Sequence, residues 1–533
     1  MKPGMQLISK GAKGPANQRI AISLILGLLA ASFLLFISNN DFELGLHPDE
    51  PLKIFPILEN RLRFAHPQLL MNFMRLAHDI SGEQSPQALV EIGRTISACF
   101  GVLLVLFSFL LARRVYGYWP GLCIAALVAT TPLISIHAHY LKEDMFMAPF
   151  FVGGIWAYLK HAEDQTRGGI IVLGVFIGLA ASAKLVGAIL VPALLCAAII
   201  NTHASRLRTV KDVLVASLVG GGVFLVVNYS VVFNFDQAIA QLGYEVRHGI
   251  VGHTLKIWPT DTYFVYHFLN SLVPGLSWPV AALFLLGLVS GFIPSFKFSS
   301  SERTILVALF MFYLAHEISP TKPFPASIRY MVPIAPLVVM MAGRGLLAVG
   351  SPGGRRRAAF AGSLVAVLIA VTTIQSGLLI RDLNNDTRLQ DKAIKGGHLV
   401  ESYTDNKLVR KKIRLTKLSG ILNQMRQKLS RLDPNNASNR KQARTARVGA
   451  LSLQQIRDRN IKHLVISSFV YDRFLYAISL RNQTDEVYKI AKQYEKLLTC
   501  RYREIKPRYK SFSFSNPVIR IIDVEPCLQH LSK

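Results

Sequence analysis

The sequence predicts a polytopic α-helical membrane protein with a small α/β domain at its C-terminal end. Its 533 residues are 51% hydrophobic, which is too apolar for an assembly of ordinary soluble domains. Several uncharged apolar runs are long enough to cross a bilayer core of roughly 30 Å. In the last part of the chain the pattern changes and alternates between helical and strand periodicity. The chain must therefore place most of its apolar surface in lipid.

Eleven apolar runs are candidates for membrane spans. Six of them are each about long enough for a full span: residues 20–38, 95–112, 119–136, 213–235, 268–296 and 358–380. Five shorter runs lie between them: residues 145–159, 168–183, 185–201, 304–315 and 330–343. The first run ends at Asn39 and Asn40 without a small-residue cleavage pattern, so we interpret it as a helix and not as a signal peptide.

The distribution of Lys and Arg predicts the orientation of these spans. Basic residues gather on alternate connections, chiefly in residues 2–19, 113–114, 206–211 and 355–357. The positive-inside rule then places the N-terminus in the cytoplasm of a plasma or inner membrane and, after eleven spans, the C-terminal region outside. The same rule accounts for the net charge of +28, so we expect anionic membrane lipids as partners and no nucleic acid. Three long outer segments are left to build a site: residues 39–93, 236–267 and 316–329.

These patterns divide the chain into three parts. We expect a transmembrane domain over residues 1–380, a basic linker over 381–447 and an extracytoplasmic α/β domain over 448–533. The linker is either a solvated segment or a helix that lies on anionic headgroups, and the sequence leaves both open. The α/β domain is expected to contain helices at 451–460 and 484–499 and strands at 463–469 and 518–524. The second helix would bury one face, formed by Val487, Ile490, Tyr494 and Leu497.

Two cysteines of this domain, Cys500 and Cys527, would lie in an oxidising compartment. Their spacing does not show whether the two sulfurs meet. A disulfide and a pair of free thiols therefore both remain open.

Lys184 interrupts an apolar stretch that extends from residue 168 to residue 201. As one helix this stretch would measure about 50 Å, which is too long for one span. We interpret it as two short spans that meet outside, with Lys184 at the apex. A charge at this depth is costly and usually functional, although a lysine that only reaches for the interface is the simpler alternative.

Acidic residues occur at two further places on the outer side, after the third span and in the first outer segment. His137, His139, Glu143 and Asp144 follow the third span, where the acids would also suit the first turn of the next helix. The histidines could equally be hydrogen-bonded residues of the interface. In the first outer segment the sequence His47-Pro-Asp-Glu-Pro holds two acids between two prolines. Such a stiff turn suits a general base, which must be held within hydrogen-bonding reach of the proton that it removes.

Taken together, four motifs resemble the membrane glycosyltransferases of the GT-C class. They are HPDEP at 47–51, HAHYLKEDMF at 137–146, SAKLVGA at 182–188 and SIRYMVPIAPL at 327–337. The sequence is most similar to the bacterial branch of the dolichyl-phosphate-mannose protein mannosyltransferase-like family. AHPQLL at 65–70, DTR at 386–388 and SSFVYDRFL at 467–475 extend the resemblance over nearly the whole chain. After DTR the sequence departs from its relatives and becomes basic, so the C-terminal part is expected to be specialised.

The resemblance implies an inverting enzyme at the outer face that takes its sugar from a polyprenyl-phosphate donor. The acceptor would be a lipid, a glycan or a protein, and mannose is the family precedent for the sugar. The matching positions are Asp49, Glu50 and Asp144 as catalytic acids, with substrate contacts from His47, His137, His139, Glu143, Lys184, Arg329 and Tyr330.

The chemistry needs a base, stabilisation of the oxocarbenium-like sugar and cations for the departing phosphate. We expect Asp49 to act as the base, and Lys184 and Arg329 to bind the phosphate. Asp144 and Glu50 would orient the sugar or stabilise its developing charge. No metal is required by this scheme, although a divalent ion near Asp49 and Asp144 is compatible with it. The alternatives are a polysaccharide polymerase or ligase and a transporter of lipid-linked sugars. A transporter would be expected to show internal repeats and charges through the membrane midplane.

Overall fold

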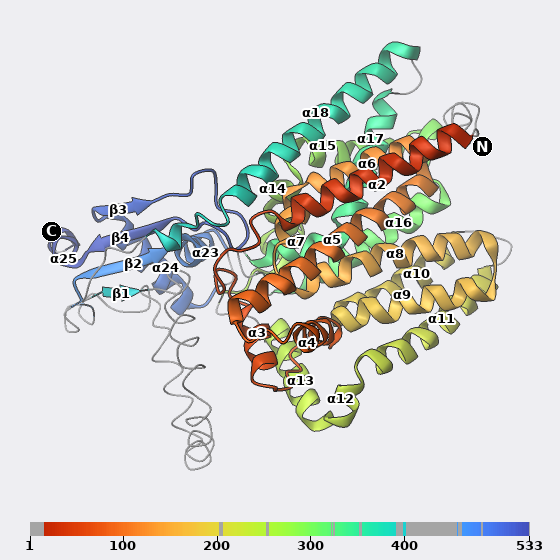
Figure 1. Ribbon diagram of the computed structural model, residues 1–533. Coiled ribbons are helices and arrows are strands. Elements are labelled where there is room, and N and C mark those ends of the chain that lie inside the picture. Colours follow the sequence, from red (N-terminus) through yellow and green to blue (C-terminus); the bar gives the residue numbers. More distant parts are fainter. Residues whose placement is uncertain are drawn as a thin grey trace.

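The computed structural model describes residues 15–201, 206–251, 255–320, 322, 326–350, 354–390, 398–400, 456, 461–480 and 483–531. A bundle of long helices forms the larger part, and a small α/β domain lies against one end of it (Figure 1). The N-terminal helix begins at the opposite end of the bundle (Figure 1).

The main helices of the bundle are apolar. They are α2 (Pro15–Ile37), α5 (Pro86–Tyr116), α6 (Tyr118–Thr130), α7 (Pro132–Ala138), α8 (Glu143–Asp164), α9 (Arg167–Ala183), α10 (Leu190–Ile200), α11 (Arg206–Val227), α15 (Trp278–Ser290), α16 (Ser300–Ile318), α17 (Ala335–Gly350) and α18 (Gly354–Arg381). The remaining helices connect them: α3 (Pro51–Leu58), α4 (Leu69–Ser81), η2 (Leu185–Ile189), α12 (Tyr229–Phe233), α13 (Phe235–Val251), η3 (Pro259–Asp261), η4 (Phe268–Leu272), α14 (Val273–Leu276), η5 (Pro294–Phe296), η6 (Ala326–Ile334) and η7 (Thr387–Leu389).

The predicted apolar runs coincide with one helix or with two successive helices, except the run at 268–296, which contains η4, α14, α15 and η5. Within the described residues, five helices are long and apolar enough to cross a membrane, or up to seven if two bent pairs are counted as spans. The bends measure 59° between α6 and α7 and 114° at the start of α15. The chain is therefore an integral, multi-pass membrane protein, as expected. The expected number of eleven spans is not confirmed, because helices such as α9 are shorter than a full span.

The break at Lys184 follows the predicted pattern of two short helices. α9 ends at Ala183, Lys184 is extended with φ −158° and ψ 133°, and η2 begins at the next residue. Gly187 makes the sharp reversal possible, because a Cβ there would collide with the carbonyl of Ala180. The backbone thus presents the lysine side chain at an apex, where it is not wrapped into a continuous helix.

The C-terminal domain contains one four-stranded sheet with the order β1-β2-β4-β3. Its strands are β1 (His398–Val400), β2 (His463–Ser467), β3 (Tyr502–Ile505) and β4 (Ile519–Asp523). β1 runs parallel to β2, whereas β4 runs antiparallel to both β2 and β3, with Val465 opposite Ile521. The helices are α23 (Ser468–Ile478), α24 (Asp485–Thr499) and α25 (Val524–Leu531).

The sequence predicted three elements of this domain, β2, α24 and β4, but not β1, β3, α23 or α25. α24 buries Val487, Ile490, Tyr494 and Leu497, the face expected from its periodicity, and Thr484 caps its first turn. The expected strand at 463–469 ends earlier, because the Ser467 side chain accepts a hydrogen bond from Phe469 and starts α23. Of the expected linker over 381–447, the structure describes only residues 381–390 and 398–400, and the latter form β1 of the sheet. The expected helix at 451–460 is described only at Ile456, which is helical.

Cys500 and Cys527 form a disulfide that joins the end of α24 to α25. Of the two possibilities that the sequence left open, the bonded one is present. This crosslink and the apolar core around Tyr494 hold the two helices together.

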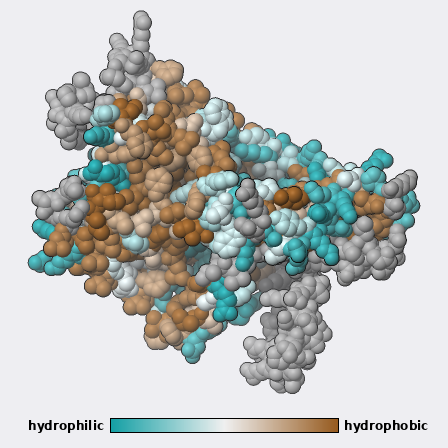
Figure 2. Space-filling model, turned by 180° about the vertical axis from the view of Figure 1, so that it is seen from behind, coloured by the Kyte–Doolittle hydropathy of each residue, from teal (hydrophilic) through white to brown (hydrophobic). Residues whose placement is uncertain are grey.

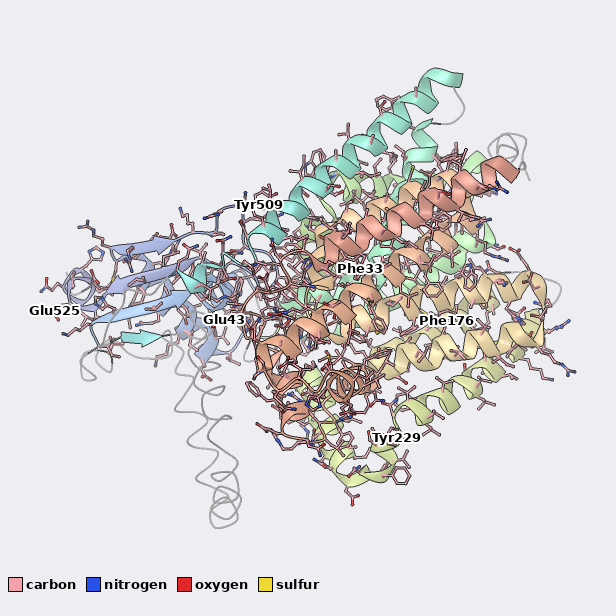
Figure 3. The ribbon with its side chains drawn as sticks, viewed as in Figure 1. Phe33, Glu43, Phe176, Tyr229, Tyr509 and Glu525 are labelled. Atoms are coloured by element: carbon pink, nitrogen blue, oxygen red, sulfur yellow. A yellow bond between two sulfur atoms is a disulfide. The ribbon has the colours of Figure 1, made fainter. Side chains whose placement is uncertain are left out.

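The two parts of the chain also differ in their surfaces. Figure 2 shows a largely apolar surface over the helical bundle and a hydrophilic surface over the C-terminal domain. The two parts meet near the end of α18, where the backbone of Tyr509 donates a hydrogen bond to Asp382 (Figure 3). Phe512 of the C-terminal domain belongs to the hydrophobic core of the bundle. The C-terminal domain thus packs against the end of the bundle through the segment that contains Tyr509 and Phe512.

Candidate active site

The candidate site lies at the end of the bundle that faces the C-terminal domain, and its first part is the turn that precedes α3. The backbone N–H of Glu50 donates to the carbonyl of His47, and that of Leu52 donates to the carbonyl of Asp49. Pro51 is the first residue of α3, where its fixed φ favours the helix and its missing N–H costs nothing. The turn therefore holds the two adjacent acids in fixed and different directions.

Asp49 points into a cluster of cations. Its Oδ2 lies 2.8 Å from Nζ of Lys142 and 2.9 Å from a guanidinium nitrogen of Arg329. The Asp49 side chain keeps 26% of its surface exposed, so a second molecule can reach it. Burial alone would raise the pKa of Asp49, but the charges of Lys142 and Arg329 outweigh it and hold this pKa well below its usual range.

Asp144 occupies the first turn of α8 and faces the same arginine. Its Oδ1 accepts a hydrogen bond of 2.6 Å from Lys184, and its Oδ2 lies 3.6 Å from Nε of Arg329. Within the described part of the chain, neither that Oδ2 nor that Nε has a hydrogen-bond partner. Arg329 thus lies between the two acids, and it contacts Asp144 less closely than Asp49.

Tyr330 provides an aromatic face beside these charges. Lys184 Nζ lies 4.8 Å from the centre of its ring, and the Arg329 guanidinium lies 5.5 Å from it. Both distances are within the range of cation–π attraction. The structure therefore brings together five residues that the sequence singled out: Asp49, Asp144, Lys184, Arg329 and Tyr330.

Glu143 joins the cluster through two lysines that the sequence did not assign to the site. Lys53 forms an ion pair with one carboxylate oxygen, and Lys142 lies 3.0 Å from the other. Two sequence features could have identified these lysines. Lys142 immediately precedes Glu143 and Asp144, and Lys53 lies one helical turn after Asp49. His66, in the AHPQLL motif, lies 3.9 Å from Glu143.

Glu50 takes a different direction from Asp49. Its carboxylate is fully buried and forms two hydrogen bonds with Arg94, of 3.0 and 2.6 Å. It also accepts the backbone N–H of Leu141, which ties the first loop to the segment before α8. This geometry favours a structural role for Glu50 over the sugar-orienting role expected from the resemblance.

The three histidines are buried around the cluster. Nδ1 of His47 accepts the backbone N–H of Asp49, whereas its Nε2 has no hydrogen-bond partner among the residues that the structure describes. His137 lies between the Leu133 carbonyl and the Ser513 hydroxyl of the C-terminal domain. His139 lies within hydrogen-bonding distance of the carbonyls of Ser135 and Ser38. His137 and His139 therefore fix the backbone around the site, and His47 supports Asp49 directly.

The donor set does not fit a divalent cation. Among the described residues, no group of three or more His, Cys, Asp or Glu side chains is arranged to hold a metal ion. Asp49 and Asp144 each face Lys or Arg nitrogens, which would repel a second cation. The chemistry that these residues support is therefore that of an anion-binding site beside a carboxylate.

Comparisons with known proteins agree with this fold. Residues 65–229 match the family model described as dolichyl-phosphate-mannose-protein mannosyltransferase. No curated protein matches the chain at a significant level of sequence similarity. Among solved structures, the chain is similar to the oligosaccharyltransferase AglB of Archaeoglobus fulgidus in complex with an inhibitory peptide and a dolichol-phosphate. That match has a TM-score of 0.51 and 13% identity and covers 92% of this chain and 80% of AglB.

Two further solved structures are similar with lower TM-scores. ArnT from Cupriavidus metallidurans, bound to undecaprenyl phosphate, matches with a TM-score of 0.49 and 17% identity, over 69% of this chain and 72% of ArnT. The S. cerevisiae protein O-mannosyltransferase Pmt1-Pmt2 complex, bound to the sugar donor, matches with a TM-score of 0.35 and 16% identity, over 45% of this chain and 36% of that chain.

The family match and the fold shared with AglB confirm the predicted resemblance to membrane glycosyltransferases of the GT-C class. Within that class, residues 65–229 are similar to the dolichyl-phosphate-mannose-protein mannosyltransferases. The matched segment contains Glu143, Asp144 and Lys184, so part of the charged cluster lies in the matched region.

Proposed function

We propose that this protein is an inverting glycosyltransferase that moves a sugar from a polyprenyl-phosphate carrier to an acceptor hydroxyl at the outer face of the membrane. The sugar is a hexose of the mannose type, and the acceptor is a lipid, a glycan or a protein. The resemblance over residues 65–229 supports the reaction class. The disulfide between Cys500 and Cys527 supports an oxidising, extracytoplasmic location for the C-terminal domain, with the N-terminus in the cytoplasm.

The observation that carries this proposal is the position of Arg329 between two carboxylates. It contacts Asp49 at 2.9 Å and Asp144 at 3.6 Å. Lys142 also forms an ion pair with Asp49, and Lys184 forms one with Asp144. Carboxylates that alternate with cations supply both a proton acceptor and a binding site for phosphate oxygens. A transporter would need no such combination at one end of its bundle.

Donor binding would change the basicity of Asp49. In the unliganded site the low pKa makes this carboxylate a weak base. A lipid phosphate that binds to Lys184 and Arg329 competes with Asp49 for Arg329, since an arginine shared between two anions is less available to each. The pKa of Asp49 then rises, and the carboxylate becomes a better proton acceptor only when the donor is present.

The transfer step follows from this arrangement. Asp49 takes the proton of the acceptor hydroxyl while the acceptor oxygen forms a bond to the anomeric carbon of the sugar. The bond between that carbon and the phosphate oxygen breaks on the opposite face, which inverts the configuration. Lys184 and Arg329 stabilise the charge on the departing lipid phosphate, and Asp144 stabilises the positive charge that develops on the sugar.

A transfer assay tests the proposal directly. Purified protein in liposomes would be given radiolabelled mannosyl- and glucosyl-phosphopolyprenols together with membrane extract as the source of acceptor. We expect stoichiometric release of polyprenyl phosphate and label in an acceptor, with inverted anomeric configuration by NMR. Mass spectrometry of envelope lipids, glycans and proteins with and without the gene product would identify the sugar as one missing monosaccharide.

The same experiments separate the rival functions. Movement of the intact phosphopolyprenol across the bilayer without release of phosphate would indicate a transporter. Transfer of an oligomer, and not of one sugar, would indicate a polymerase or ligase.

A further inference from the structure

A loop of the C-terminal domain reaches into the site. Residues 509–517 connect β3 with β4, and their central part is buried against the end of the bundle: Phe512 and Phe514 are each only 4% exposed. Figure 3 shows Tyr509, at the start of the loop, beside the end of α18, whereas Glu525 lies at the far end of the domain. The loop is thus the part of the domain that meets the site.

Phe514 lies directly on the residues that support the acid. Its ring packs against the His47 ring with a centroid distance of 4.6 Å and an edge-to-face angle of 67°. The Arg329 guanidinium lies 5.7 Å from the centre of the same ring. His47 in turn accepts the backbone N–H of Asp49. One side chain of the C-terminal domain therefore contacts both neighbours of the proposed base.

Arg388 ties this loop to the first outer loop. Its guanidinium donates to the carbonyl of Phe514 at 2.6 Å and to the carbonyl of Leu46 at 2.8 Å. The same group forms a buried pair with Asp386, at 2.7 and 2.8 Å. Leu46 immediately precedes His47, so a single buried cation joins the backbone on both sides of the contact between His47 and Phe514.

The backbone conformation of the loop is fixed by contacts with the rest of the structure. Ser513 and Asn516 have φ angles of 52° and 55°, a region that residues other than glycine seldom adopt. The backbone N–H of Asn516 donates to Asp386 at 2.7 Å, and the Ser513 hydroxyl contacts His137 at 3.1 Å. Such strained residues persist only where the surroundings fix them, and they gather at functional sites.

We propose that residues 509–517 form part of the active site. In this site Phe514 excludes water from His47, so that the imidazole stays neutral and keeps accepting the hydrogen bond from the Asp49 N–H. Arg388 is the positioning residue that holds this loop against the first outer loop. The proposal rests on the proposed function for its catalytic consequence. Its structural consequence, the ordering of residues 46–50, does not depend on that function.

Burial under Phe514 and the surrounding charges together set the protonation state of His47. Burial is the largest influence and lowers the pKa of His47 well below its usual value. Asp49 opposes this effect, whereas Lys142, Arg329 and His137 add to it. If water replaced the Phe514 ring, the imidazole would take a proton at mildly acidic pH, lose its acceptor nitrogen and release the Asp49 backbone.

Hydrogen–deuterium exchange of the purified full chain in detergent tests the structural part without any substrate. We expect Phe514→Leu and Arg388→Lys to raise exchange of the amides in residues 46–50 by roughly ten-fold. The matched controls are Phe474→Leu, whose ring stacks on Tyr494 in the core of the same domain, and Arg501→Lys on its exposed surface. Faster exchange at 46–50 in the Phe474→Leu control to the same extent would show a general loss of stability and overturn the proposal.

The catalytic part has its own readout. With the labelled phosphopolyprenol that wild type uses, Phe514→Leu should lower kcat about ten-fold with little change in the donor KM, and kcat/KM should fall as pH drops from about 6.5 to 5. Wild type and Phe474→Leu should lack this acidic fall. An unchanged pH profile in Phe514→Leu overturns the proposal. If wild type transfers no sugar, the proposed function fails, and the exchange experiment still decides whether the loop orders residues 46–50.

Discussion

Arg329 donates a hydrogen bond of 2.9 Å to the carboxylate of Asp49, although 280 positions separate the two residues in the sequence. The bond joins the first loop to η6, and it makes the ionisation of the proposed base depend on a residue that is also expected to bind phosphate. The low pKa of Asp49 follows from this pair together with Lys142. A site of this kind is weakly basic until an anion competes for its cations.

Replacement of Asp49 by Asn should abolish most transfer and leave donor binding nearly intact or stronger. The amide has almost the same volume but cannot accept the hydroxyl proton, and it no longer competes with phosphate for Arg329. We expect a fall in kcat of at least about 10². Asp79→Asn, on the exposed face of α4, is the matched control. A purified Asp49→Asn protein with a rate near that of wild type would show that another group accepts the proton.

The two adjacent acids should behave differently, because Glu50 faces Arg94 and not the cluster. Glu50→Ala leaves a fully buried guanidinium without its partner, which should cost about 3 to 5 kcal/mol of stability. Thermal unfolding in detergent measures this loss. The double variant Glu50→Ala with Arg94→Met should recover much of the stability and also the activity. A Glu50→Ala protein that is as stable as wild type but inactive would instead assign Glu50 to the substrate.

Much of the fold could be predicted from sequence because its signals are local. A charge in the middle of an apolar stretch predicted the break at Lys184, and a 3.6-residue period predicted the buried face of α24. The separate directions of Asp49 and Glu50 could not be predicted, since adjacent residues of a turn diverge according to backbone angles that the letters do not encode. The contact between Phe514 and His47 has no sequence signal at all, because it depends on how the C-terminal domain docks.

Lys142 should give the reaction an alkaline limit. Burial lowers its pKa to about 8, and Arg329 acts in the same direction. The amine is therefore mostly charged below about pH 8 and mostly neutral above it. Loss of this charge beside Arg329 weakens the attraction of the site for the anionic donor, so kcat/KM for the donor should fall as pH rises through about 8. Asp49 stays ionised over this range because its pKa is far lower. In Lys142→Arg the cation persists, and the fall should move to higher pH.

Lys489→Arg is the control for this profile, since Lys489 lies on the exposed side of α24, away from the cluster. A profile that is identical in wild type and Lys142→Arg would exclude Lys142 as the group that sets the alkaline limit.

The last prediction concerns Lys184, whose amine contacts Asp144 at 2.6 Å and the face of Tyr330 at 4.8 Å. If it binds the donor phosphate, Lys184→Met should weaken donor binding by roughly 1.5 to 3 kcal/mol, or about ten- to a hundred-fold, because a charge-assisted contact in a partly dehydrated site is lost. If it only anchors the apex between α9 and η2, the methionine keeps the packing, and only expression should decline.

Binding of polyprenyl phosphate to the purified variants measures the difference. Lys160→Met, at the other end of α8, repeats the substitution on an exposed lysine and should leave affinity unchanged. Because Lys184→Met leaves Asp144 without its closest cation, the double variant with Asp144→Asn separates that repulsion from the lost contact. If the double variant binds polyprenyl phosphate as tightly as wild type, the lysine serves chiefly to neutralise Asp144. If it remains at least about ten-fold weaker, the amine itself holds the phosphate.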